Sequence, residues 1–285
     1  MSKVAVITDS DCSLPLSLTD SLGIRQVPIT IQFGEEILRS GIDINDVELF
    51  QRVDREGKLP TTAAPSPGDF LAAYKAAFEE DKADEVLCFC VSGAISSTYN
   101  AAKVAAEEMS DKKITVIDTE TLSMGQGYMT LAAAEILKNG GSLDDAVNAA
   151  KDIGTRAHLY GALATLKYLS MSGRVSHLAS GMAGMLDIKP ILCVQNGKLD
   201  MLEKVRTRKK AWERVVELCR QDTQGKKIVK MAVLDVNAPK DGDEFEALLR
   251  ANLDCPAEIL RSELSAGLSV HTGAGLVAVG FATDK

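Results

Sequence analysis

The sequence predicts an α/β protein of two domains: an N-terminal α/β domain on a parallel sheet, and a C-terminal α+β domain with a mixed or antiparallel sheet. Two observations carry this prediction. Strand-length apolar runs alternate with helical patterns through the first half, and after about residue 155 short strands follow one another with fewer helices between them. A length of 285 residues suits two domains, which we place at residues 1–155 and 156–285.

The first half contains the elements of a mostly parallel sheet with helices on both faces. Capping residues indicate where helices begin: Ser66, Pro67 and Asp69 open one helix, and Ser142 with Asp145 opens another. The expected strands are residues 4–8, 27–33, 37–38, 86–91 and 114–117, and the expected helices are residues 14–22, 47–55, 66–78, 98–109, 124–137 and 142–153.

The second half is richer in strands. Its clearest helix covers residues 208–220, with apolar residues at helical spacing, and Asn196-Gly197 is typical of a tight hairpin turn between two strands. The expected strands are residues 159–164, 189–194, 198–203, 228–235, 257–262 and 276–281.

Composition excludes several classes of function. The 32 basic and 40 acidic side chains give a net charge of −8, and aromatic residues are only 5%, so nucleic-acid binding is not expected. No apolar run reaches the roughly 18 residues of a membrane span, and the start is too short and too soon acidic for a signal peptide. The scattered cysteines indicate buried thiols, and the three histidines are too dispersed for a metal site. We therefore expect a cytoplasmic protein without stable membrane insertion or a metal.

Three polar turns gather hydroxyls where a strand gives way to a helix or a loop, at residues 61–66, 92–98 and 118–123. The carboxyl ends of parallel strands share one edge of a sheet, so such turns can converge on one ligand, and helix amino termini there favour an anion. Capping is the simpler role for Ser66 and Ser97 individually. Capping leaves four further hydroxyls unexplained, those of Thr61, Thr62, Ser92 and Ser96.

Other candidates lie in the second half. His271 stands in a His-Thr-Gly-x-Gly loop that can present an imidazole to an anion, although a lone histidine is more often structural. Arg174 follows a glycine turn and is a head-group partner, a tie between the domains or a surface residue, of which we favour the tie between the domains. Arg206 begins a basic cluster whose other members suit a solvated helix start. Residues 179–186 are rich in small residues and methionine, which favours tight packing over an apolar cavity.

Six motifs in order resemble the DegV family of bacterial fatty-acid-binding proteins, over nearly the whole chain. They are Thr8-Asp9-Ser10, residues 60–67 from Pro60-Thr61-Thr62, Ser96-Ser97-Thr98-Tyr99-Asn100, Ser172-Gly173-Arg174-Val175, Ile188-Lys189-Pro190-Ile191-Leu192 and His271-Thr272-Gly273. The resemblance implies the two-domain architecture above, with a long-chain fatty acid in the cleft between the domains.

The resemblance also implies roles for individual residues. Thr62 and Ser96 fall where the family holds the ligand carboxylate, and His271 and Arg206 fall where it surrounds the head group for presentation to a kinase. Ser97 and Arg174 complete the candidate site residues. The sequence departs from the family pattern at Ala63 and Ala64, which replace serine and glutamine, at Ser97, which replaces glycine, and at Ser13, where aspartate is common.

The leading hypothesis is therefore a carrier that binds a long-chain fatty acid and presents its carboxylate to a separate fatty-acid kinase for acyl-phosphate formation. No Gly-x-Ser-x-Gly elbow or Walker loop occurs, so we expect no catalytic residue and no cofactor, the fatty acid being a ligand. One alternative is a small-molecule phosphotransferase or hydrolase that uses Ser96 or His271 on the same fold. Another is a structural or interaction domain without a ligand.

Overall fold

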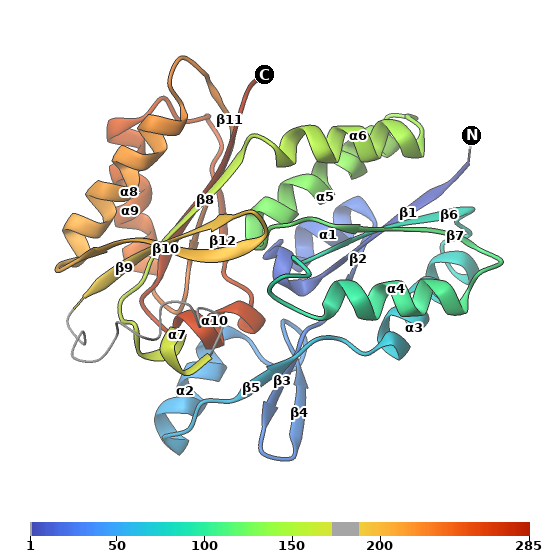
Figure 1. Cartoon of the computed structure of the whole chain (residues 1–285), viewed down its shortest axis with the longest axis horizontal. Helices are drawn as coiled ribbons and strands as arrows, with labels where there is room; N and C mark the ends of the chain where they lie inside the picture. The colour runs from blue at the N-terminus through green and yellow to red at the C-terminus, as the bar shows by residue number, and fades with distance from the viewer. Residues whose placement is uncertain (1, 173–187) are drawn as a thin grey trace.

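The computed structural model describes residues 2–172 and 188–285. A four-stranded sheet of order β2-β1-β6-β7 organises the first half (Figure 1). All its neighbouring strands pair in parallel, so their carboxyl ends meet at one edge. The strands are β1 (Val4–Asp9), β2 (Ile24–Val27), β6 (Glu85–Cys90) and β7 (Lys113–Asp118).

Helices cover both faces of this sheet because its strands present apolar residues on alternate sides. Val86 and Cys88 pack with α3 (Pro67–Glu79) and α4 (Thr98–Glu108). Leu87 and Phe89 point the other way, into the cluster formed with α5 (Ser123–Lys138) and α6 (Leu143–Gly154). The expected capping boxes at Ser66–Asp69 and Ser142–Asp145 are both present, which confirms the predicted starts of α3 and α6.

The second half forms a six-stranded mixed sheet of order β10-β9-β8-β13-β11-β12. Only β11 and β12 pair in parallel. Helices α8 (Arg208–Asp222) and α9 (Pro239–Asn252) cover one face, on the outer side of the molecule (Figure 1). The strands are β8 (Ala157–Ala162), β9 (Lys189–Gln195), β10 (Lys198–Val205), β11 (Ile228–Asp235), β12 (Leu260–Glu263) and β13 (Val277–Thr283). The predicted fold class is confirmed.

Helix α5 joins the two sheets. It packs on β1 and β6 and also on β8 and β13, and the Tyr128 hydroxyl donates to the backbone carbonyl of Gly280 at 2.8 Å. One hydrophobic cluster therefore contains residues of both halves. The separate strand sets on either side of residue 155 support our proposed division into residues 1–155 and 156–285.

A small antiparallel sheet of order β4-β3-β5 lies beside three further helices (Figure 1). It consists of β3 (Thr30–Phe33), β4 (Glu36–Arg39) and β5 (Thr61–Ala63), and the helices are α2 (Asp46–Glu56), α7 (Lys167–Ser172) and α10 (Ala266–Thr272). The remaining elements of the first half are the short 3-10 helix η1 (Ser10–Cys12) and α1 (Leu16–Leu22).

Some predicted elements were wrong. The single strand expected at residues 27–33 is two strands, β2 and β3, because Pro28 between them has no N–H for a ladder. Four further elements, β5, α7, α9 and α10, were not predicted from the sequence. In α9 the early Gly242 weakens the helical pattern, but the close approach of the Arg261 guanidinium leaves no room there for a Cβ.

The described residues contain neither a membrane-spanning helix nor a cluster of metal ligands. Among residues 2–172 and 188–285, no helix is long and apolar enough to span a bilayer. Over the same two ranges, no group of three or more His, Cys, Asp or Glu side chains is arranged to hold a metal ion.

Candidate functional site

A polar cavity of about 600 Å³ lies where the carboxyl edge of the parallel sheet meets β5 and α10. Thr62, Ser96 and His271, three of the residues expected to bind the head group, all line it. The other lining residues are Asp11, Ile29, Ala63, Ala64, Pro65, Ser66, Pro67, Ile95, Ser97, Asn100, Ala101, Val104, Gly267 and Leu268. The fold thus brings together side chains from the beginning and the end of the chain.

Strand alternation decides which threonine enters the cavity. Thr61 and Thr62 are neighbours in β5 and point to opposite sides. Thr61 is exposed and lies outside the cavity lining, whereas Thr62 is half-buried and lines it. Its Oγ1 lies 2.9 Å from Nε2 of His271. Of the two hydroxyls in the Thr-Thr pair, that of Thr62 is therefore positioned for a ligand.

Ser96 and Ser97 stand at the amino terminus of α4. Ser96 Oγ lies 2.8 Å from Thr98 Oγ1 and accepts a hydrogen bond from the Thr98 N–H. Ser97 occupies the capping position, but its side chain makes no capping hydrogen bond, so the capping role expected for it was wrong. Its exposed hydroxyl lines the cavity instead. Together with the partial positive charge of the helix end, these hydroxyls suit an anion.

His271 lies in the last turn of α10, not in the loop that the sequence analysis expected. Gly273 ends the helix with a φ of +81°, and the ring of Tyr168 packs so closely that a Cβ would collide with it. The glycine of the His-Thr-Gly motif therefore lets α10 end against α7, immediately after the histidine.

Helix α10 is held by hydroxyl contacts to the first half. Ser265 Oγ donates to Asp11 Oδ1 at 2.8 Å, and Ser269 Oγ donates to Asp46 Oδ1 at 2.6 Å. The N–H of Gly267 also donates to Ser40 Oγ. These contacts place the imidazole of His271 beside β5.

Asp9 organises the sheet edge beneath the cavity. It is fully buried at the end of β1, where Oδ1 accepts from the N–H of Asp11 and Oδ2 accepts from the N–H of Val91. Burial raises the pKa of its carboxyl to about 6, although these hydrogen bonds favour the charged form. Asp9 thus links the segments after β1 and β6, from which Asp11 and Ser96 reach the cavity.

Several hydroxyls expected near the ligand serve the fold instead. Ser92 is buried and its Oγ donates to the carbonyl of Gly197 at 2.6 Å, which fixes the tip of the β9–β10 hairpin. In the third polar turn, the Asp118 carboxylate accepts hydrogen bonds from the N–H groups of Gly93 and Glu120. The Thr119 hydroxyl donates to the backbone carbonyl of Cys90. None of these residues lines the polar cavity. Two of the three predicted turns converge on it.

The two candidate arginines lie elsewhere. Arg206 is exposed, directly after the end of β10, and does not line the polar cavity. Arg174 lies outside the described residues, as do residues 179–186. Ala63 and Ala64 line the cavity, so two small apolar side chains stand beside Thr62.

A second, apolar cavity of about 70 Å³ adjoins the polar one and shares Ile95, Leu268 and His271 with it. Its floor is the face of the six-stranded sheet that points away from α8 and α9. Small residues on this face, Gly161 and Ala278, leave the space open, while neighbouring Tyr160 and Val279 pack on the other side. Its remaining lining residues are Leu122, Leu159, Leu192, Cys193, Val194, Leu199, Leu264, Thr272 and Leu276.

Asp11, Asn100 and the leucines of the apolar cavity were not predicted as site residues. Asp11 directly follows the Thr-Asp-Ser motif, and Asn100 is the last residue of the Ser-Ser-Thr-Tyr-Asn motif. Their positions at these motifs could have identified them as candidate site residues. The leucines could not be identified from sequence. Apolar residues in strands predict burial, but they do not show whether the buried side chain faces a ligand cavity or the packed core.

Comparisons with known proteins all indicate one family. The family model described as "Uncharacterised protein, DegV family COG1307" matches residues 3–284. A DegV domain-containing protein from Streptomyces coelicolor is 35% identical over 278 residues, covering 97% of each chain. Protein DegV from Bacillus subtilis is 29% identical over 278 residues, covering 97% of this chain and 98% of that one.

Solved structures agree with the sequence relatives. A DegV family protein from Thermus thermophilus, described as binding fatty acid, superposes with a TM-score of 0.89 at 32% identity, covering 99% of this chain and 100% of the other. The structure of DegV from Bacillus subtilis, described as a fatty acid binding protein, has a TM-score of 0.88 at 28% identity and full coverage of both chains.

Proposed function

We propose that this chain, which belongs to the DegV family, is a carrier that binds a long-chain fatty acid. The observation that carries the proposal is the junction of the two cavities: a hydroxyl- and imidazole-lined polar space opens at Ile95, Leu268 and His271 onto an almost entirely apolar one. An amphiphile with one anionic end fits this arrangement. The solved relatives described as fatty-acid-binding proteins support it.

In this proposal the carboxylate lies among Thr62, Ser96 and His271. The Thr62 and Ser96 hydroxyls can each donate a hydrogen bond to a carboxylate oxygen, and the amino terminus of α4 adds favourable electrostatics. His271 Nε2, now 2.9 Å from Thr62, fixes the orientation of that hydroxyl. Ser97 contributes a further hydroxyl at the rim of the site.

The acyl chain provides most of the affinity. Each buried methylene contributes roughly 0.8 kcal/mol, so about a dozen contribute on the order of 10 kcal/mol before ordering costs. The chain would run past Leu268 toward Gly161 and Ala278, between the two proposed domains, and because a cavity of about 70 Å³ has space for only part of it, the surrounding leucine side chains would move apart on binding. Affinity then comes from the apolar cavity and orientation from the polar one.

A hydrolase or phosphotransferase that uses Ser96 as its nucleophile gains no support from the geometry. The Ser96 hydroxyl bonds to Thr98 and the His271 imidazole bonds to Thr62, whereas a serine nucleophile needs its hydroxyl bonded to a base. We therefore propose a binding protein without catalytic residues and without a cofactor.

Native mass spectrometry of protein purified without detergent tests the carrier proposal. We expect a bound species with the mass of a long-chain fatty acid, released by organic extraction and identified by chromatography. A chain that carries no lipid, does not take up added fatty acid and hydrolyses esters or phosphoesters would contradict the proposal.

We propose further that the bound carboxylate is presented to a separate fatty-acid kinase in the cytoplasm for acyl-phosphate formation. His271 lines the polar cavity, and in this proposal it stands next to the carboxylate, where it can carry positive charge as negative charge builds up during phosphoryl transfer. Arg206 is exposed and free of any role in holding the acyl chain, which suits contact with the kinase or its phosphates.

Variants of His271 and Arg206 distinguish binding of the fatty acid from presentation of its carboxylate to the kinase. His271→Ala and Arg206→Ala should keep fatty-acid affinity within about tenfold, or roughly 1.4 kcal/mol, because the acyl chain stays buried. Each should lower acyl-phosphate formation by a cognate kinase and ATP at least tenfold. Lys209→Ala, an exposed cation near Arg206 in sequence, is the control. Normal turnover by both variants would remove these residues from the presentation site.

A further inference from the structure

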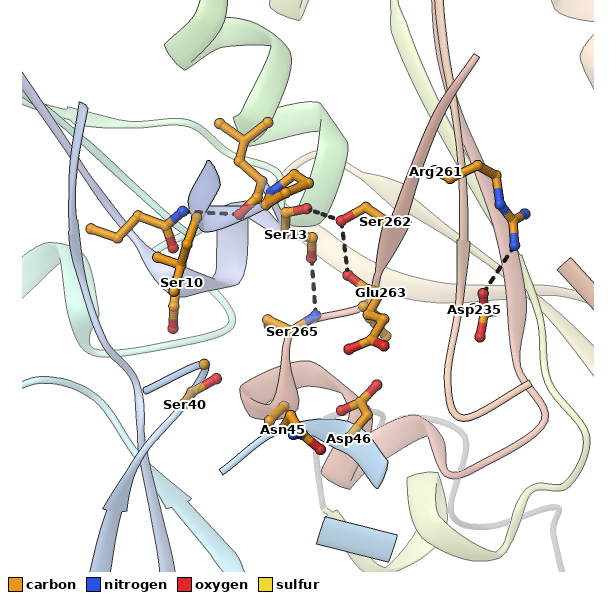
Figure 2. Close-up of a pocket in the computed structure, with 17 residues that line it drawn as sticks. Ser10, Ser13, Ser40, Asn45, Asp46, Asp235, Arg261, Ser262, Glu263 and Ser265 are labelled. Atoms are coloured by element: carbon orange, nitrogen blue, oxygen red, sulfur yellow. Dashed lines mark hydrogen bonds and ion pairs between the residues drawn. The ribbon is translucent and has the colours of Figure 1, made fainter. Parts of the chain in front are cut away.

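A second polar cavity, of about 460 Å³, is lined by residues of both halves of the chain, among them Ser13 of the first half and Ser265 of the second (Figure 2). Helix α10 contributes to both polar cavities: Ala266 lines this one, while Leu268 and His271 line the head-group cavity. Its lining is rich in hydroxyls and carboxylates: Ser10, Ser13, Ser40, Ser262 and Ser265, with Gln26, Asn45, Asp46, Asp235, Arg261 and Glu263.

Asp46 is the unusual member of this lining. Only 2% of its surface is exposed, and Figure 2 shows its carboxylate turned toward Glu263. Oδ1 accepts from Ser269, but Oδ2 has no hydrogen-bond partner. A buried carboxylate oxygen without a partner costs free energy unless a ligand supplies a donor.

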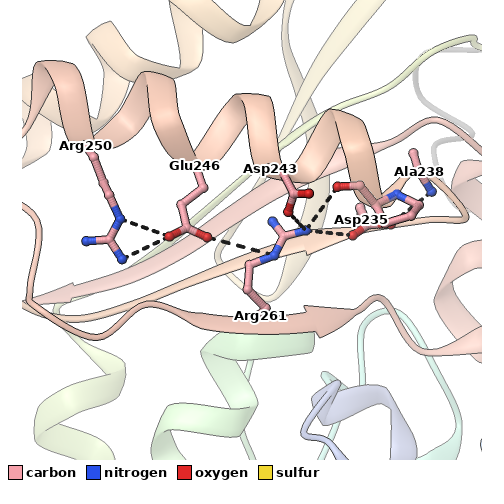
Figure 3. A network of polar contacts seen from close by, with 7 residues as sticks. Asp235, Ala238, Asp243, Glu246, Arg250 and Arg261 are labelled. Atoms are coloured by element: carbon pink, nitrogen blue, oxygen red, sulfur yellow. Dashed lines mark hydrogen bonds and ion pairs between the residues drawn. The ribbon is translucent and has the colours of Figure 1, made fainter.

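The one cation that lines this cavity is already paired with carboxylates, although its Nη1 has no hydrogen-bond partner. Arg261 contacts Asp235 at 3.2 Å and is also paired with Asp243 and Glu246 of α9, and Glu246 pairs in turn with Arg250 (Figure 3). Asp235 also accepts a hydrogen bond from the N–H of Ala238. Among the described residues, Asp46 and Glu263 have no ion-pair partner. The unbalanced charge of the cavity is therefore negative.

Burial, together with the charges of Glu263 and Asp235, raises the pKa of the Asp46 carboxyl to about 7, although the hydrogen bond from Ser269 favours the charged form. This direction is expected when no cation stands beside a buried acid. A positive group beside Asp46 and Glu263 would therefore be stabilised by both carboxylates.

We propose that this cavity binds a small hydroxylated primary amine, whose ammonium donates to Asp46 Oδ2 and Glu263 while its hydroxyl groups bond to the surrounding serines. The serine side chains supply both donors and acceptors, which suits a neutral hydroxylated portion. An ammonium fits better than a metal ion, since no described group of three His, Cys, Asp or Glu side chains is arranged to hold one.

Calorimetric titration of the full-length protein with ethanolamine tests the proposal, with ethylene glycol and Mg²⁺ titrated in parallel. We expect saturable binding of ethanolamine alone. Asp46→Asn keeps the shape and an acceptor for Ser269, and should weaken binding at least tenfold. Glu263→Gln, at an exposed position, should weaken it to a smaller extent.

Asp54→Asn is the matched control, because Asp54 is an exposed acid on the same helix as Asp46. It should bind ethanolamine as the unaltered protein does. The proposal is overturned if ethanolamine does not bind at millimolar concentrations, if ethylene glycol or Mg²⁺ binds in its place, or if folded Asp46→Asn and Glu263→Gln variants both bind as tightly as the unaltered protein.

Discussion

Gly161→Val is expected to lower the affinity for a long-chain fatty acid about a hundredfold while leaving the protein folded. Gly161 lines the apolar cavity from the middle of β8. A Cβ there would meet Leu276 and Ala278 at 3.6 and 3.8 Å, which are ordinary contacts, so the strand tolerates a side chain. The branched methyl groups would occupy the space of the acyl chain. Losing the burial of three or four methylenes costs roughly 3 kcal/mol, or about a hundredfold.

Fluorescent fatty-acid titration measures this affinity, and thermal unfolding checks that the variant is folded. Val229→Ile is the control, because Val229 is an exposed position of β11 in the same sheet, outside the cavity. If folded Gly161→Val binds long-chain fatty acids as tightly as the unaltered protein, the acyl chain does not occupy this cavity.

Thr62→Ala and Ser96→Ala should each weaken fatty-acid binding by roughly ten- to a hundredfold. Each change removes one hydrogen bond to a charged oxygen, which contributes roughly 1.5–3 kcal/mol. Thr62→Ser keeps the hydroxyl and should restore most of the affinity. The same titration measures all three variants.

Thr61→Ala is a closely matched control, since Thr61 is the neighbouring threonine in β5 and points away from the cavity. It should bind as the unaltered protein does. Unchanged affinity in both Thr62→Ala and Ser96→Ala would show that the carboxylate is held by other groups, and equal losses in Thr61→Ala and Thr62→Ala would point to the stability of β5 instead.

Much of the local structure could be predicted from sequence because its causes are local. The capping boxes at Ser66 and Ser142 depend on residues three positions apart, and both predicted helix starts are correct. The apolar run of β6 predicted a strand buried on both faces. Helix α10 could not be predicted from its own residues, because they show little helical periodicity. Hydrogen bonds from Ser265 and Ser269 to residues of the first half stabilise it instead.

The sequence by itself determined the fold class, most of the strands and helices, and the motifs that carry Thr62, Ser96 and His271. Only the tertiary structure decided that Thr62 and not Thr61 faces the cavity, that Ser92 anchors a hairpin, and that His271 lies 2.9 Å from a residue 209 positions earlier. The physical reason is that hydrogen-bond geometry within a turn or helix end depends on near neighbours. A cavity instead depends on which faces of distant strands oppose one another, and on small residues such as Gly161 at the places where they meet.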